Sequence, residues 1–464
     1  MAGPREVTIS YCKECFIKQQ RIDELEGEMA RLKAKLRYQE RTAKEGFFGS
    51  STPSSKLPVK SNTLEERTER RGGGRKGHKG HGRSSICAEE ADRIEYVAVE
   101  GTCPDCGTPL NDKGTRVRTV IDCEPVRMKR ILYHLERKRC PKCKKVISAR
   151  APGVLPKSLY GNQLLAHVAA QHYLHGDTLG QIERQTGVGY SSLVDAMHQL
   201  ARRLKNVPGV LIQAYRKAPV KHADETGWRT DGRNGYSWLF CTPDLSIFRI
   251  CKTRSSRIVR EVLGEVPLQG VLVVDRYSGY NKAPCSIQYC YAHLLRAVKD
   301  IEKQFPGNAE IKTFVDELSR QLANAISLRR LDITDRQFKK QAAQTKRKII
   351  DITRRQARHP AIQKIQDIFR GNAGRLYHWA EDRNVPADNN LAERELRPLV
   401  IARKVSFGSQ SDEGSRTREI LMTILRTLNK RTSDVADTLK ASLDKLAEEP
   451  QLDPYKLFFP NDTS

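Results

Sequence analysis

The fold is decided by four short runs, KHADETGW (221–228), GYSWLFCTP (235–243), LSIFRICKT (245–253) and GVLVVD (270–275). Each run is short, rich in aromatic or β-branched residues and bounded by turn residues, which predicts a strand. DGRNG (231–235) predicts a hairpin loop between the first two strands. SSRIVREVLGEV (255–266) has the apolar spacing of a helix, and the fourth strand is expected to be buried and to end at Asp275.

The order strand, strand, strand, helix, strand opens a ribonuclease-H-like fold. SIQYCYAHLL (286–295) predicts a further strand that leads into a helix. The sequence from about 296 to 385 is basic and helical in its spacing, and 388–431 predicts one or two more helices. We therefore expect a multidomain α/β protein. Its expected parts are a core at 216–300 and 386–435, a helical insertion at 301–385 and a C-terminal tail at 436–464.

Three acidic residues are placed where they can meet. Asp224 is expected at the end of the first strand, Asp275 at the end of the fourth, and Glu393, in DNNLAERELRP, near the start of a helix after the insertion. Carboxylates at one edge of a sheet can hold two Mg²⁺ ions, which suits displacement at a phosphodiester. The alternative for any single acid is a surface carboxylate or a helix cap. Glu395 lies about 200° round the helix from Glu393 and is expected to face elsewhere.

The first 86 residues predict two segments. Ile22, Leu25, Met29, Leu32 and Leu36 follow heptad spacing, which predicts a coiled-coil segment at 1–46 that helps the chain dimerise, or an ordinary amphipathic helix. Residues 47–86 form a Gly- and Ser-rich basic linker. This linker is either an arm that lies along DNA phosphates, with Arg75, Lys76 and Lys79 as contacts, or a solvated tether.

Two Cys-x-x-Cys pairs predict a zinc ribbon at 87–155. CPDC supplies Cys103 and Cys106, and CPKC supplies Cys140 and Cys143. Four thiolates complete a tetrahedral zinc site and leave no open position, so one structural Zn²⁺ is expected. The residues between the two pairs alternate in polarity, which predicts strands.

Residues 156–215 predict helices that bind DNA. TLGQIERQTGVGYSSLVDAMHQLARRL, from Thr178, resembles a helix-turn-helix, with a turn at Gly187 and Gly189 and a second helix capped by Ser191 or Ser192. A plain helical hairpin is the alternative. The second helix would turn Leu193, Met197 and Leu200 inward and present His198, Gln199, Arg202 and Arg203 outward.

Composition points to a polyanionic partner. Of 464 residues, 82 are Lys or Arg and 55 are Asp or Glu, which gives a formal net charge of +27. Such an excess favours nucleic acid as the partner. We find neither a membrane-length apolar run nor the apolar core of a secretory signal, and 12 cysteines without such a signal favour thiols or metal ligands over disulfides. A cytoplasmic, nucleoid-associated protein that does not enter membranes is expected.

These motifs, in this order, resemble those of insertion-sequence transposases of the IS-sixty-six (IS66) type. The matching sequences are FGSSTPSSK (48–56), RGGGRKGHKGHGR (71–83), CPDC and CPKC, ADETGW (223–228), VVDRYSGY (273–280), CYAHLLR (290–296) and DNNLAERELRPLVIARKVSFGS (388–409). The resemblance covers most of the chain. It implies an Asp-Asp-Glu site at Asp224, Asp275 and Glu393 with two Mg²⁺ or Mn²⁺ ions.

The resemblance also implies an activity. Such an enzyme hydrolyses a phosphodiester at each element end and then transfers the 3′-hydroxyl to target DNA. Double-stranded DNA, at both terminal repeats and target, would be the partner, together with a homodimer or larger assembly and small element-encoded accessory proteins. Two alternatives are a metal-dependent nuclease without strand transfer and a domesticated DNA-binding protein that does not turn over.

Further matched residues are assigned supporting roles. Cys290 and His293, in CYAH, would support the active site, with plain packing as the alternative. Arg397 lies four residues after Glu393 on the same helical face and would clamp a phosphate. The other expected contacts to the DNA backbone on this helix are Arg394, Arg403 and Lys404.

Overall fold

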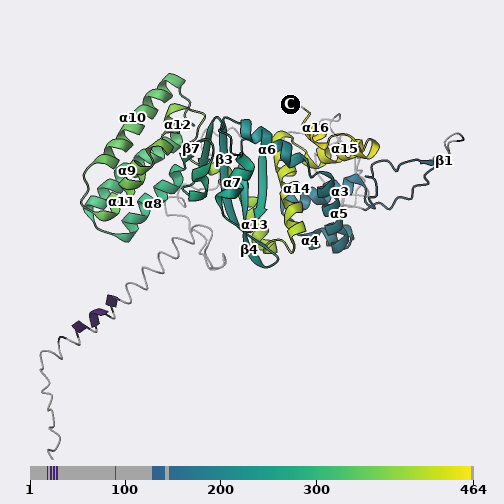
Figure 1. Ribbon diagram of the computed structural model, residues 1–464, viewed down its shortest axis with the longest axis horizontal. Helices are drawn as coiled ribbons and strands as arrows, with labels where there is room; N and C mark the ends of the chain where they lie inside the picture. Colours follow the sequence, from purple (N-terminus) through teal and green to yellow (C-terminus); the bar gives the residue numbers. More distant parts are fainter. Residues whose placement is uncertain are drawn as a thin grey trace, which may run out of the picture. The chain divides into compact units, whose positions relative to one another are not determined.

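The structure of the chain is a computed structural model (Figure 1). The structure describes residues 128–139, 141 and 146–460, together with 18, 21, 22, 24–26, 28, 29 and 89. It divides into two compact units, Met1–Met128 and Lys129–Ser464. The linker at 47–86, with Arg75, Lys76 and Lys79, lies outside the described residues, as do Cys103, Cys106, Cys140 and Cys143.

Only part of the heptad segment is described. The described residues from Lys18 to Met29 are helical, and the side chains of Ile22, Leu25 and Met29 are exposed. Leu32 and Leu36 lie outside the described residues. The expected coiled coil therefore stays a prediction.

A five-stranded mixed sheet forms the centre of the second unit. Its order is β5–β4–β3–β6–β7, where β3 is Val220–Thr230, β4 is Arg233–Cys241, β5 is Ser246–Cys251, β6 is Val271–Val274 and β7 is Ser286–Tyr289. Strands β3, β4 and β5 are antiparallel, while β6 and β7 run parallel to β3. Helix α7 (Ser256–Leu263) joins β5 to β6. The predicted order of three strands, a helix and a strand is confirmed.

Two details of the first hairpin differ from expectation. The turn consists of Asp231 and Gly232 alone, both with positive φ (52° and 68°), and is not the five-residue loop predicted. The ladder from β3 to β4 therefore continues to Thr230↔Arg233. As a result Asp224 lies in the middle of β3 and not at its end, and it pairs with Leu239.

The register still places Asp224 beside Asp275. Strand β6 pairs with β3 only as far as His222↔Val273. Asp224 lies two residues beyond His222 and Asp275 lies two residues beyond Val273, so the two acids are at equal height on neighbouring strands. Parallel neighbours are about 4.8 Å apart, and equal parity gives both residues the same face of the sheet.

Helices cover the sheet and extend from it (Figure 1). Before the sheet come α3 (Asn162–Ala170), the π-helix η4 (Gln171–His175), α4 (Leu179–Thr186), α5 (Tyr190–Arg203) and α6 (Val207–Lys217). After β7 come α8 (Tyr291–Gln304), α9 (Ala309–Leu328), α10 (Asp335–Arg354), α11 (Pro360–Gly371) and α12 (His378–Glu381). The last four are α13 (Asn390–Ser406), α14 (Asp412–Arg431), α15 (Val435–Glu448) and α16 (Pro454–Phe458). The region from 296 to 385 is helical without a strand, as predicted.

Helices α4 and α5 form the expected pair, with one correction. Gly187 ends α4 in the left-handed conformation at φ 69°, and Leu193, Met197 and Leu200 are buried, as predicted. The N-cap of α5 is Gly189, and neither Ser191 nor Ser192 caps it, because the helix already begins at Tyr190. The left-handed Gly187 reverses the chain early, so no serine is left outside the helix to cap it.

Side chains of α14 cover the outer edge of β5. The backbone N–H groups of Ser246 and Phe248 donate to Thr427 Oγ1 (3.1 Å) and Thr423 Oγ1 (3.0 Å), and that of Ile250 donates to Glu419. The three acceptors are spaced four residues apart on one face of α14, which matches every second residue of the strand. This edge of the sheet is thereby closed to pairing with another strand.

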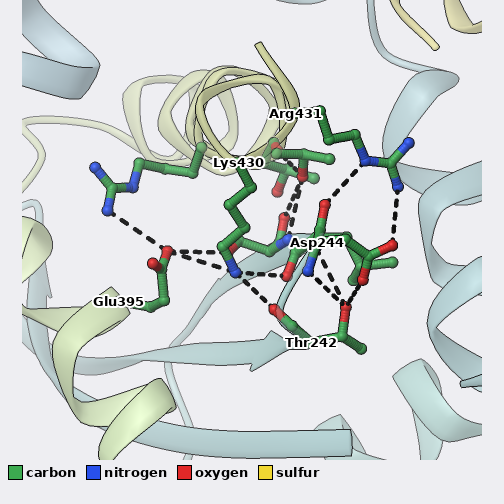
Figure 2. A network of polar contacts seen from close by, with 10 residues as sticks. Thr242, Asp244, Glu395, Lys430 and Arg431 are labelled. Atoms are coloured by element: carbon green, nitrogen blue, oxygen red, sulfur yellow. Dashed lines mark hydrogen bonds and ion pairs between the residues drawn. The ribbon is translucent and has the colours of Figure 1, made fainter. Parts of the chain in front are cut away.

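A polar network joins α13, α14 and the β4–β5 turn (Figure 2). Lys430 Nζ donates to the carbonyls of Thr242 (2.8 Å) and Leu245 (2.9 Å) and lies 3.7 Å from Glu395 Oε2. Glu395 also accepts from Ser246 Oγ (3.1 Å) and pairs with Arg426. Glu395 therefore points to α14, away from Glu393, as expected from the helical spacing.

The remaining elements are small. Strands β1 (Arg137–Arg139) and β2 (Val146–Ser148) pair antiparallel, and the chain between them carries the CPKC sequence. Residues 128–136 form no regular element, so the strands predicted between the two Cys-x-x-Cys pairs appear only at 137–139 in the described part. No described helix is both long enough and apolar enough to cross a membrane.

Candidate active site

Asp224 and Asp275 are held by the backbone of the sheet. Asp224 is 6% exposed, and its Oδ1 accepts from the backbone N–H of Glu225 (2.9 Å). Asp275 is half-buried just past β6, and its Oδ1 accepts from the N–H of Tyr277 (2.8 Å). Each carboxylate accepts through Oδ1 from a backbone N–H one or two residues later in the chain, so each keeps a second oxygen to bind something else.

Asn389 fastens the start of α13 to β3. Its Oδ1 accepts from His222 Nδ1 (2.9 Å), and its Nδ2 donates to the carbonyl of Ala223 (2.8 Å). Its backbone N–H donates to Cys290 Sγ (3.2 Å). Burial lowers the pKa of His222 to about 4, so this ring is neutral and serves as a donor through Nδ1. The first turn of α13 is thereby anchored next to Asp224.

Glu393 lies in that first turn and faces α8. Its Oε1 accepts from Arg296 Nη2 (3.2 Å) and lies 3.9 Å from His293 Nδ1. A carboxylate in the first turn is also favoured by the positive end of the helix dipole. Glu393 is therefore held from two directions, by its own helix and by α8.

The three acids interact electrostatically. The pKa of Asp224 is raised well above its usual range, first by burial and then by the negative charges of Glu225, Asp275 and Glu393. Asp275 and Glu393 therefore lie close enough to Asp224 to act on its ionisation, and the three are called the acid cluster below. Among the described residues neither Asp224 nor Asp275 forms an ion pair with a Lys or Arg.

Glu225 is a fourth acid, which sequence reasoning missed. It is 1% exposed and forms an ion pair with Arg254, and it accepts a hydrogen bond from the Tyr280 hydroxyl. Burial raises its pKa, and Asp275 raises it further. Asp224 was predicted from its expected place at the end of a strand and from the ADETGW motif, whereas Glu225 pairs with a residue 29 positions away, which no local pattern shows.

Cys290, His293 and Glu393 form a group able to hold a metal ion. One ligand atom from each lies within 4.8 Å of the others. Cys290 precedes α8 and His293 lies in its first turn, so the i, i+3 spacing turns both toward the start of α13. The pKa of His293 is lowered by burial and by Arg296, while Asp275 and Glu393 act in the opposite direction. Burial raises the pKa of the Cys290 thiol to about 12. Both residues therefore lie beside the acid cluster, where support was expected.

The basic residues that we expect to contact DNA differ in their exposure and in their partners within the chain. Arg394, Arg397 and Lys404 are exposed on α13. Arg403 donates to Thr226 Oγ1 (3.0 Å) and the carbonyl of Gly227 (2.7 Å), so its guanidinium holds α13 to β3. On α5, Arg202 is exposed and forms an ion pair with Glu413, Arg203 is half-buried, and His198, expected outward, bonds to Thr417 of α14. The DNA contacts stay predictions.

The acid cluster fits hard divalent cations. Carboxylate oxygens are the ligands that Mg²⁺ and Mn²⁺ prefer. The raised pKa of Asp224 shows that burial and the neighbouring carboxylates oppose its ionisation, although Glu225 and Glu393 each pair with an arginine. A bound cation would offset the negative charge of the carboxylates, so the donor set suits such an ion on its own chemistry.

Comparison with known proteins agrees with this architecture. The family model "Transposase IS66 family" matches residues 157–417, and the model of the zinc-finger binding domain of IS66 transposases matches 100–144. The zinc-finger match supports a bound Zn²⁺ at the residues that include both Cys-x-x-Cys pairs.

Two curated relatives are the uncharacterized proteins y4qI and y4jD of Sinorhizobium fredii. Both are 23% identical, over 358 residues (65% of this chain, 63% of the relative) and 366 residues (70% of each). The match to the first relative thus spans less than two thirds of its length. Because the transposase model covers more than half of the chain, including the sheet, the acid cluster and α13, this chain belongs to the IS66 family of transposases.

Proposed function

We propose that this chain is a DNA transposase with a ribonuclease-H-like core, in which Asp224, Asp275 and Glu393 hold two divalent ions. Three antiparallel strands followed by two parallel strands support the core assignment. The observation that carries the proposal is that Asp275 and Glu393, from other parts of the chain, both raise the pKa of the buried Asp224.

Each residue of the cluster has a part in the proposed mechanism. Asp224, the most buried of the three, Asp275 and Glu393 would hold the ions through their carboxylate oxygens. Two such ions, when bound, would stabilise the attacking and the leaving oxygen of an in-line displacement. Arg296 fixes the direction of Glu393 through Oε1, and His293 lies where it can accept or hold a proton beside that carboxylate.

The substrate follows from the charge around the site. Arg394 and Arg397 are exposed on α13, directly after Glu393, and the chain carries a net charge of +27. Their guanidinium groups would hold phosphates of double-stranded DNA at the cluster. Hydrolysis would free a 3′-hydroxyl at each element end, and the same cluster would then position that hydroxyl against target DNA, since both steps are displacements at phosphorus.

Recognition and assembly complete the proposal. The zinc ribbon, the basic linker and the α4–α5 pair would bind the terminal repeats. Two ends must be held together for transfer, so a homodimer or larger assembly is proposed, together with element-encoded accessory proteins and a cytoplasmic, nucleoid-associated location.

The test is cleavage of a duplex that carries the end of the encoding element, with Mg²⁺ or Mn²⁺ added. Asp224→Asn, Asp275→Asn and Glu393→Gln should each lower the cleavage rate about a thousandfold or more and still bind the duplex. Asp367→Asn, at an exposed ion pair on α11, is the matched control and should cleave normally.

A second arm uses pre-cleaved ends with a free 3′-hydroxyl. Joined product supports a transposase, whereas cleavage without joining would support a nuclease. Variants of the three acids that still cleave at the control rate would rule out the proposed site.

A further inference from the structure

A second site lies at the opposite end of α13 from the acid cluster. A cavity of about 220 Å³ is enclosed by η4, the α4–α5 pair, the last turns of α13 and the loop that enters α14. Ala402, Val405 and Ser406 line it on α13. At 1.5 Å per residue these are roughly 14 to 20 Å along the helix from Glu393, so the cavity is separate from the proposed catalytic site.

The cavity is lined by a buried arginine that no carboxylate neutralises. Arg418 is 6% exposed. Its guanidinium lies 5.1 Å from the ring centroid of Tyr173 and 5.2 Å from that of Trp228, and Nη2 contacts His172 Nε2 at 2.8 Å. Among the described residues no Asp or Glu forms an ion pair with it. A buried charge of this kind is costly unless an opposite charge is supplied.

His172 is neutral, so it neither supplies a negative charge to Arg418 nor attracts an anion itself. Its Nδ1 contacts the carbonyl of Asp177 at 2.7 Å, so Nδ1 carries the hydrogen and donates it. Its Nε2 therefore accepts from Arg418, and the ring is neutral. Burial, followed by the charge of Arg418, lowers the pKa of His172 to about 4, in agreement with this tautomer.

The rest of the lining offers donors. Ser411, the N-cap of the 20-residue helix α14, lines the cavity; its Oγ accepts from the N–H of Gly414 (3.0 Å) and keeps its own hydrogen to donate. Thr178, the N-cap of α4, also lines the cavity, but its N–H and hydroxyl both donate to Gln181. Helix N-termini favour negative groups. Asp177 is the one acidic residue of the lining, and among the described residues its carboxylate forms no ion pair with Arg418.

We propose that this cavity is an anion site that takes a phosphate group, with Arg418 as its principal ligand. A planar guanidinium offers paired N–H donors that match two phosphate oxygens. A DNA strand and a free nucleotide both present such a phosphate, and the chemistry of recognition is the same for either source. The site does not depend on the acid cluster, so it can be tested without cleavage.

The experiment measures thermal unfolding of the full chain during titration with inorganic phosphate, at an ionic strength held constant with sodium chloride. Wild type should be stabilised by phosphate. Arg418→Met should lose this response, with an apparent affinity weaker by about tenfold or more. Arg416→Met is the matched control: it removes one positive charge from an exposed position on the same helix and should respond like wild type.

A conservative variant covers the case in which Arg418→Met does not fold. Arg418→Lys keeps the charge but loses the paired donors, so its phosphate response should be weaker than that of wild type. A phosphate response in Arg418→Met equal to that in Arg416→Met would overturn the proposal. So would the absence of any phosphate response in wild type beyond the chloride control.

Two further arms identify the source of the phosphate. If a DNA strand supplies it, Arg418→Met should reduce the slope of log affinity against log salt for a duplex by about one relative to Arg416→Met. If a free nucleotide supplies it, a deoxynucleoside monophosphate should stabilise wild type more than inorganic phosphate does, and duplex affinity should not depend on Arg418.

Discussion

At the scale of single residues, the ionised form of one carboxyl group in the cluster, that of Asp224, is destabilised in the folded chain. Asp224 is buried, and three neighbouring acids oppose its ionisation, so its pKa in the folded chain is raised. A raised pKa means that the folded state keeps a proton that the unfolded chain has already released. Without a bound cation, the contribution of Asp224 to stability is therefore complete at low pH and is lost as the pH rises from its ordinary value through the folded one.

We predict that Asp224→Asn stabilises the metal-free protein. In the presence of a chelator at neutral pH, its free energy of unfolding should exceed that of wild type by about 1 kcal/mol, because the amide cannot ionise. Urea unfolding from pH 4 to pH 8 measures the difference, which should shrink toward pH 4. Added Mg²⁺ should stabilise wild type and leave the variant unchanged. A variant less stable than wild type in chelator at pH 8 would contradict this account of the cluster.

Residue identities in the cluster were predictable only in part. Asp275 follows a strand and Glu393 lies in the first turn of a helix that periodicity detects, whereas Asp224 lies in the middle of β3; motif order singled out all three. Asn389 was not singled out, although it stands directly before a helix, because its partners His222 and Ala223 lie more than 160 positions earlier. Hydrogen bonds of that range leave no local pattern in a sequence.

At the scale of elements, α13 is positioned by its two ends. Asn389 joins the start of the helix to β3, and Arg403 joins its last turns to the carbonyl of Gly227 and the hydroxyl of Thr226. Both attachments are to the same strand that carries Asp224. The direction of Glu393 relative to Asp224 is therefore set by side chains outside the acid cluster.

We predict that Asn389→Ala acts mainly through the placement of Glu393. The loss of two buried hydrogen bonds should lower the free energy of unfolding by about 2 kcal/mol. Cleavage should also require a higher Mg²⁺ concentration for half-maximal rate, a change that lost stability alone would not produce. Asn384→Ala, at an exposed position shortly before α13, is the control. An Asn389→Ala protein with the wild-type Mg²⁺ dependence would show that the residue has no positioning role.

Element types were more predictable than element ends. Short runs bounded by turn residues detected β3 to β7, and apolar spacing detected α7 and the helical regions from α8 to α14. The β3–β4 turn was placed over five residues because DGRNG holds two glycines, whereas Asp231 and Gly232 alone adopt the positive φ values that close a two-residue turn. The side chains of α14 that cover β5 had no counterpart in the pattern, because Thr reads as a neutral residue in a helix.

At the scale of the whole molecule, zinc and the acid cluster belong to different segments. The zinc-finger match ends at residue 144, while β3, β6 and α13, which carry the three acids, lie between 220 and 406. The basic charge is distributed over both segments. Binding of element ends and chemistry at phosphorus are thus expected to be separable by mutation.

We predict one Zn²⁺ per chain, bound by the four cysteines. Cys103→Ser and Cys140→Ser should each release the zinc and weaken binding to an element-end duplex, because an incomplete tetrahedral site loses the folding energy that the metal supplies. Stabilisation of the core by Mg²⁺ should persist. Zinc content by atomic absorption and duplex binding are the measurements, with the half-buried Cys285→Ser as the matched control. Full zinc content in both variants would refute the assignment.

The long helical segment from α8 to α12 starts and finishes at positions that are hydrogen-bonded to each other. The backbone N–H of Tyr291 donates to the carbonyl of Ala387 (2.7 Å), and that of Asn389 donates to Cys290 Sγ (3.2 Å). A segment whose two ends already touch imposes almost no length requirement on what lies between them. Insertions, deletions or replacements within this segment can therefore be tolerated while β7 before it and α13 after it keep their positions.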